Sequence, residues 1–107
     1  MARVVFQKKY ADFNEAITIL KTAEEFLANN KYAFAYVKGE HVWRRDDGFL
    51  ASERIIKAET DKDGLITISA WVRGILGGEM GVDGFLSVFA KKQLAETLEN
   101  MKEAVFK

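Results

Sequence analysis

Few side chains in this sequence have the chemistry that catalysis requires. His41 is the only histidine among the 107 residues, and cysteine is absent. Thiolate catalysis, disulfides and cysteine-ligated zinc are therefore excluded. A serine–histidine hydrolase would need a serine in a nucleophile-elbow sequence, and Ser52, Ser69 and Ser87 all lack one. We therefore interpret His41 as a strand histidine beside a turn.

The carboxylates Glu79 and Asp83 are a second candidate for acid–base chemistry. Both lie in the stretch 74–84, which has five glycines in eleven residues. This stretch lacks the Gly-Lys-Ser/Thr ending of a phosphate-binding loop and the glycine spacing of a dinucleotide site. At 61–64 the glycine comes too early for a calcium loop, so a turn is favoured. The residues predict no cofactor and no metal site, and they favour a protein without enzymatic activity.

The charge balance argues against a nucleic-acid partner. Sixteen basic and sixteen acidic residues give a formal net charge of zero, whereas phosphate binding requires a basic excess. The Arg44-Arg45 pair beside Trp43 could contact phosphate or anionic lipid. Two aspartates, Asp46 and Asp47, follow directly, so local ion pairing is favoured. Charges interrupt the first twenty residues, and no apolar run reaches the ~20 residues of a membrane span. We expect a cytoplasmic protein.

Hydrophobic spacing predicts the elements that position these residues. A short strand is expected over residues 2–9. Asp12, with Glu15 three positions later, is a capping-box signature for a helix. Asn29-Asn30 would end this helix, because asparagine tolerates the left-handed conformation. Apolar residues at steps of three or four form one stripe along it: Phe13, Ala16, Ile17, Leu20, Ala23 and Leu27.

Four more strands and a second helix are expected after it. Alternating side chains and turn signals place strands at 32–37, 41–45, 49–60 and 65–73, with turns at 38–40, 46–48 and 61–64. The stretch 74–84 predicts an irregular loop, and 85–90 fits either a strand or a connector. From about Lys91, a helix carries apolar residues on one face: Leu94, Leu98, Met101 and Val105.

The order strand, helix, four-strand antiparallel meander, helix predicts one α+β domain over residues 1–107. Two helices would cover one face of the sheet in a two-layer arrangement. This order matches the TBP-like fold and resembles a short form of the helix-grip fold. Such architectures carry many functions, so the fold alone does not identify one.

Strand alternation leaves two interpretations of the sheet open. If the small residues lie beneath the helices, the aromatic side, with Trp43 and also Trp71, is an exposed binding surface. If instead the aromatic residues fill the core, the alanines face water. The two sides of strand 32–37 are Tyr32, Phe34 and Tyr36 on one, and Ala33, Ala35 and Val37 on the other.

Over residues 31–105 the sequence resembles a family of small bacterial domains that often follow an N-terminal zinc ribbon. The similarity is carried by Gly39-Glu40, Val42-Trp43, Gly48-Phe49-Leu50, the strand Ile66 to Trp71, Gly78-Glu79-Met80-Gly81, Gly84-Phe85 and Lys91-Lys92. The resemblance implies the fold and the domain limits, and the family offers no activity to transfer. The sequence departs from the family in lacking the zinc ribbon and in having Ala90 in place of a proline before the paired lysines. The loop after the tryptophan strand also looks shorter here.

We expect a non-enzymatic interaction domain that self-associates, as a homodimer, through its sheet or the sheet edge. The residues expected to bind are Tyr36, Trp43, Arg44, Trp71 and Glu79. An alternative is a carrier of a small apolar, lipid-like ligand in a groove between the sheet and the C-terminal helix. A third hypothesis, a hydrolase or isomerase, would use Glu79 and Asp83. The expected partners are therefore a second copy, another protein or a small apolar ligand.

Overall fold

The computed structural model describes residues 3–46, 53–73 and 88–106, with side chains in the last segment from Lys92 onward. Its elements are β1 (Val4–Lys9), α1 (Phe13–Asn29), β2 (Ala33–Val37), β3 (Glu40–Arg45), β4 (Glu53–Thr60), β5 (Leu65–Arg73) and α2 (Val88–Ala104). The predicted α+β composition is confirmed. The predicted loop 74–84, Glu79 and Asp83 within it, and the turn residues Asp47-Gly48 lie outside the described residues.

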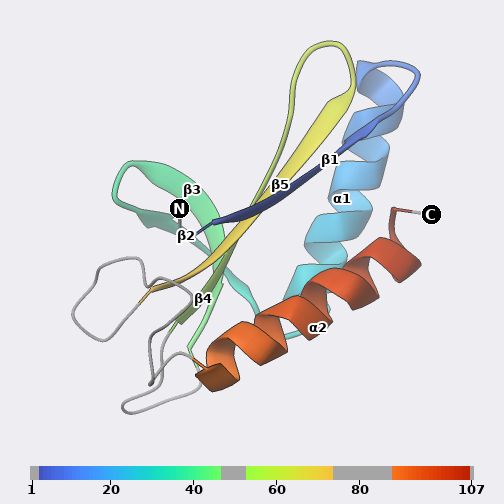
Figure 1. Ribbon diagram of the computed structural model, residues 1–107. Coiled ribbons are helices and arrows are strands. Elements are labelled where there is room, and N and C mark those ends of the chain that lie inside the picture. Colours follow the sequence, from blue (N-terminus) through green and yellow to red (C-terminus); the bar gives the residue numbers. More distant parts are fainter. Residues whose placement is uncertain (1–2, 47–52, 74–87, 107) are drawn as a thin grey trace.

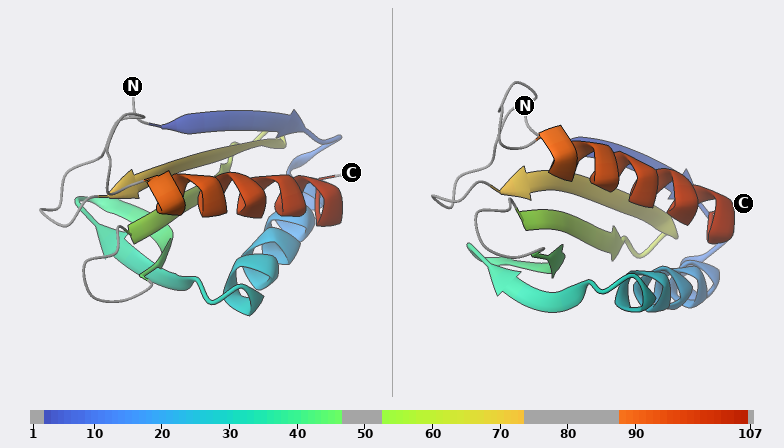
Figure 2. Two further views of the ribbon diagram at one scale, coloured as in Figure 1. Left: turned by 60° about the horizontal axis from the view of Figure 1, so that its bottom comes forward. Right: turned by 90° about the horizontal axis from the view of Figure 1, so that it is seen from below.

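One antiparallel sheet carries the fold, with strand order β1-β5-β4-β3-β2. Both helices lie on the same face of this sheet, where they pack mainly on β4 and β5 (Figures 1 and 2). We call this the helix face and the other the opposite face. β1 and β2 are the two edges of the sheet among the described strands.

The main core fills the space between the helices and the sheet. α1 contributes Ala16, Ala23 and Leu27 to it, so much of the predicted apolar stripe is confirmed. Phe13 is 42% exposed and stays outside. The helix α2 begins three residues before the predicted Lys91. Leu94, Leu98 and Met101 of α2 and Val105 just after it are buried as predicted. The sheet contributes Ile56, Ile66, Ile68, Ala70 and Val72 to the same core.

Both predicted ends of α1 are confirmed, since the cap is at Asp12 and the helix ends at Asn29 with Asn30 as its C-cap; only the left-handed conformation expected of asparagine there is wrong. The Glu15 N–H donates to the Asp12 side chain at 2.8 Å, as the capping signature predicted. At the other end, however, Asn30 has φ −97°, and Lys31 takes the left-handed conformation with φ +68°. The Lys31 N–H donates to the Ala28 carbonyl and the Tyr32 N–H to that of Leu27. This is the Schellman pattern, and its geometry places the reversal at Lys31.

Two predicted turns are confirmed. Lys38 and Gly39 have φ values of +48° and +84°, as expected of a two-residue type I′ hairpin turn between β2 and β3. In the turn before β5, the Asp61 carboxylate accepts hydrogen bonds from the Leu65 and Asp63 N–H groups. These bonds hold the pKa of Asp61 below its ordinary value, and the bond from Leu65 has the largest effect.

Candidate interaction surface

Four aromatic side chains form a continuous row on the helix face of the β2–β3 hairpin. Along the row, the ring centroids of Tyr36 and His41 are 4.8 Å apart, those of His41 and Phe34 5.6 Å, and those of Phe34 and Trp43 5.4 Å. We call these four residues the aromatic row. Phe34 is 58% exposed and Tyr36 66% exposed, which is unusual for side chains of this size.

The hairpin turn explains why these rings meet. In a two-residue hairpin the closing pair, Val37 and Glu40, exchanges both hydrogen bonds, and the next pair along exchanges none. The pairs Tyr36–His41 and Phe34–Trp43 are therefore non-hydrogen-bonded pairs, whose side chains lie closest. The same alternation points the N–H and C=O groups of Phe34 and Tyr36 away from β3, toward the outer edge of β2.

The placement of the helices explains why the aromatic row is exposed. Tyr32 is buried in the main core and Trp43 is partly buried against it. The helices pack mainly on β4 and β5, and the tip of the hairpin points away from α1 (Figures 1 and 2). The interpretation with alanines beneath the helices is therefore wrong. The aromatic residues lie on the helix face, but only the Tyr32 end of that side reaches the core.

Trp71 lies on the other side of the sheet from Trp43, so the prediction that they share a face is wrong. The register pairs Trp43 with Ile56, whereas Trp71 pairs with Ile55, the next residue along β4. Neighbouring strand residues point to opposite faces. Trp71 is only 4% exposed and packs in a second cluster with Val42 and Ile55, which we call the Trp71 cluster.

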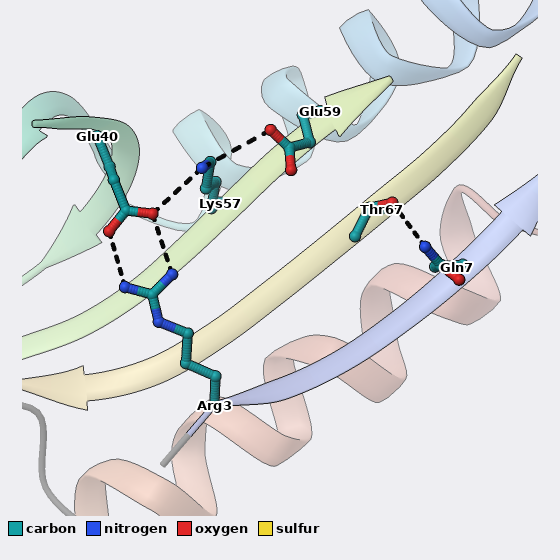
Figure 3. A network of polar contacts seen from close by, with 6 residues as sticks. All are labelled: Arg3, Gln7, Glu40, Lys57, Glu59 and Thr67. Carbon is teal, nitrogen blue, oxygen red and sulfur yellow. Dashed lines mark hydrogen bonds and ion pairs between the residues drawn. The ribbon is translucent and has the colours of Figure 1, made fainter. Parts of the chain in front are cut away.

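A polar network covers the Trp71 cluster on the opposite face. The Arg3 guanidinium lies 3.5 Å from the centroid of the Trp71 ring. It donates two hydrogen bonds to the Glu40 carboxylate, at 2.7 and 3.0 Å, and Lys57 donates a third at 3.1 Å (Figure 3). These contacts lower the pKa of Glu40 from 4.5 to about 2, and the hydrogen bond from Arg3 has the largest effect. The opposite face is therefore closed around Trp71 by paired charges.

Arg44 also belongs to a charge network rather than to an open anion site. Its guanidinium lies 3.1 Å from the Glu53 carboxylate, whose other oxygen lies 2.7 Å from Arg73. The Glu53 carboxylate on β4 thus lies between two arginines, one on each of the adjacent strands β3 and β5. The structure therefore divides the predicted binding residues. Tyr36 and Trp43 are together in the aromatic row, Arg44 and Trp71 are on the opposite face, and Glu79 is outside the described residues.

The described residues do not assemble a catalytic constellation around the single histidine. His41 points to the helix face, whereas Ser69, which pairs with Lys57 and Val5, points to the opposite face. Tyr10, another titratable side chain, lies at the corner between β1 and α1. Its burial raises the pKa of its hydroxyl, and the nearby charge of Glu15 raises it further. In the part of the chain that the structure describes, no three metal-ligating side chains come together.

Along the part of α2 whose side chains the structure describes, apolar side chains fill the space predicted for an apolar ligand. The residues of α2 that face the sheet, Leu94, Leu98 and Met101, are buried in the main core. A surface hollow of about 460 Å³ lies instead on the outer side of α2, lined by Lys92, Ala95, Glu96, Glu99 and Asn100. Neither α1 nor α2 has the length and apolar character needed to span a bilayer.

Sequence reasoning missed two parts of these surfaces. Phe34 and His41 could have been assigned to the aromatic row, because the Lys38-Gly39 turn alone sets the pairs Phe34–Trp43 and Tyr36–His41. No sequence signal identifies Arg3, since its contacts require that β1 lie beside β5.

Comparison with protein-family models, curated proteins and solved structures gives no match to this chain.

Proposed function

We propose that this protein is a non-enzymatic interaction domain that binds an extended polypeptide strand along the β2 edge. In solutions of the pure protein, that strand is β2 of a second copy, so the domain self-associates. The observation that carries this proposal is the exposure of Phe34 and Tyr36 on a strand that pairs on one side only among the described strands. An exposed aromatic patch beside an unpaired strand edge is typical of a protein-binding surface.

The backbone geometry supports an antiparallel pairing of two β2 strands. Phe34 and Tyr36 carry the outward N–H and C=O groups, so each can form a hydrogen-bonded pair with the other residue of the second copy. This pairing places Ala35 on a twofold axis and the ring of Phe34 beside Tyr36 of the second copy. The same patch then contacts itself, as a symmetric dimer requires.

Sedimentation velocity over increasing protein concentration tests self-association. We expect a reversible, concentration-dependent dimer in the wild type, and a monomer for Phe34→Lys, because a charge on the edge strand opposes pairing. The matched control is Val5→Lys on β1, the other edge strand, where Val5 is 53% exposed. If the dimer persists in Phe34→Lys but is lost in Val5→Lys, the two copies meet through β1, and the proposed contact through β2 is wrong.

Amide hydrogen exchange measures the outward backbone groups directly. At low concentration, the N–H groups of Phe34 and Tyr36 should exchange quickly, while those of Ala35 and Val37 are protected by bonds to β3. On dimerisation, Phe34 and Tyr36 should become protected. Protection of all four amides in the monomer would contradict the proposed edge geometry.

We also propose that the arrangement is a short TBP-like or helix-grip-like fold and that the chain belongs with the bacterial domains it resembles. Support comes from the order of elements and from the pairing of consecutive strands β2 to β5. An experimental structure of a member of that family would test this. A different strand order there would separate the two.

A further inference from the structure

Two lysines flank β2, one at each end of the strand. Lys31 precedes β2, Lys38 follows it, and both are exposed. Neither takes part in an ion pair within the part of the chain that the structure describes. By contrast, the basic side chains around the Trp71 cluster are all paired with carboxylates: Arg3, Arg44, Lys57 and Arg73.

These lysines weaken, without preventing, the pairing of β2 with a second copy. When two β2 strands pair about Ala35, Lys38 of one copy comes opposite Tyr32 of the second copy, one residue from that copy's Lys31. Like charges at this separation repel. Lysines at a sheet edge commonly oppose such pairing. The charges therefore favour a strand whose ends are acidic.

We propose that the preferred occupant of the β2 edge is an extended segment of another protein with acidic residues at both ends, an inference that rests on the proposed function. The ends must be seven residue steps apart, as Lys31 and Lys38 are. Eight extended residues, at about 3.3 Å per residue, span roughly 23 Å, which covers the five residues Ala33–Val37 of β2 and reaches beyond both ends. Between the acidic ends, every second side chain lies on the helix face, beside Phe34 and Tyr36.

The interior of the segment should therefore alternate, with apolar side chains next to the aromatic row. Main-chain hydrogen bonds to Phe34 and Tyr36 would provide affinity for any extended strand. The two lysines would add selectivity for acidic ends, which a neutral strand lacks. Their flexible four-carbon stems allow the ammonium groups to reach a carboxylate without a fixed geometry.

Fluorescence anisotropy with three labelled peptides tests this preference. The probe is Asp-Thr-Val-Thr-Val-Thr-Val-Asp with blocked ends, compared with the same peptide ending in Asn or in Lys. At low salt we expect the Asp peptide to bind about fivefold or more tighter than the Asn peptide, since each exposed ion pair contributes modestly. The Lys peptide should bind most weakly. Added salt should narrow these differences.

Variants of the protein assign the effect to the two lysines. The double variant Lys31→Gln/Lys38→Gln should bind the Asp and Asn peptides equally and should self-associate more strongly than the wild type. The matched control, Lys21→Gln/Lys92→Gln, removes two exposed lysines from the helices and should retain the preference for the Asp peptide.

The outcomes separate this inference from the proposed function. Equal binding of the Asp and Asn peptides by the wild type would overturn the acidic preference while leaving edge binding intact. Equal loss of preference in both double variants would also overturn it, because net charge alone would then explain the effect. A monomer that binds none of the peptides would refute the proposed function itself.

Discussion

Gly64 and Gly39 both have positive φ, but their surroundings differ. A Cβ added to Gly64 would lie 2.7 Å from the Asp12 carbonyl oxygen, whereas one added to Gly39 would lie 4.0 Å from the Tyr36 hydroxyl. We predict that Gly64→Ala lowers the free energy of unfolding by about 2–4 kcal/mol, from backbone strain and the contact with Asp12. Gly39→Ala should cost only the strain, about 1 kcal/mol. Urea denaturation measures both, and equal losses would show that the contact with Asp12 is unimportant.

Glu40 should make stability depend on pH. Its pKa is about 2 in the folded protein, below its ordinary value of 4.5. Because the folded pKa is the lower one, the ion pairing stabilises the fold above pH 4.5 and is lost as the pH falls toward 2. We predict that Glu40→Gln is less stable than the wild type at pH 7 and that this difference shrinks below pH 4.5.

Denaturation curves at several pH values between 2 and 7 would measure this difference. Glu59→Gln is the control, because Glu59 is 55% exposed and pairs with Lys57 at 3.7 Å. It should change stability less at neutral pH. If the difference in free energy of unfolding between Glu40→Gln and the wild type stays constant with pH, the role assigned to Arg3 is wrong.

At the scale of elements, the junction between α1 and β2 contains an avoidable strain. Lys31 occupies the left-handed position of the Schellman motif, where glycine is the usual residue. We predict that Lys31→Gly raises the free energy of unfolding by about 0.5–1 kcal/mol, because glycine has no Cβ to strain a left-handed backbone. Lys31→Ala, which keeps a Cβ, should bring no such gain. Thermal and urea denaturation of the three proteins would show the order.

The elements were largely predictable because local patterns determine them. The alternation in β5 and the cap at Asp12 required no knowledge of distant contacts. Composition predicts the left-handed residue at Asn29-Asn30, but the structure has it at Lys31, and the Asn30 side chain donates instead to the Phe26 carbonyl at 2.7 Å. A composition rule for caps does not include such a bond.

The candidate surface was less predictable, since it depends on register and on where the helices stop. Trp43 and Trp71 were grouped by residue type, but an offset of one residue on β4 separates them. Likewise, the exposure of Tyr36 depends on the helices packing on β4 and β5 and leaving the hairpin tip uncovered. Neither fact is contained in the pattern of any single strand.

At the scale of the whole molecule, both faces of the sheet contribute to stability although the two described helices cover only one of them. The Trp71 cluster is buried without a described helix above it. We predict that Trp71→Ala costs about 3–5 kcal/mol, as for a buried tryptophan. Tyr36→Ala should cost about 0.5 kcal/mol or less, as at a surface site. Denaturation of both variants would check this, and similar losses would contradict the assignment of Tyr36 to an exposed surface.

The position of β1 beside β5 has a consequence for how the chain is made. Gln7 and Thr67, which pair across these strands, are 60 positions apart in sequence. At about 5–20 residues per second, Gln7 is synthesised roughly 3–12 s before Thr67. The hairpins from β2 to β5 can close as they emerge, but β1 must wait with its exposed valines unpaired. During translation, β1 therefore cannot take its place in the sheet until β5, 60 positions later in the register, has been made.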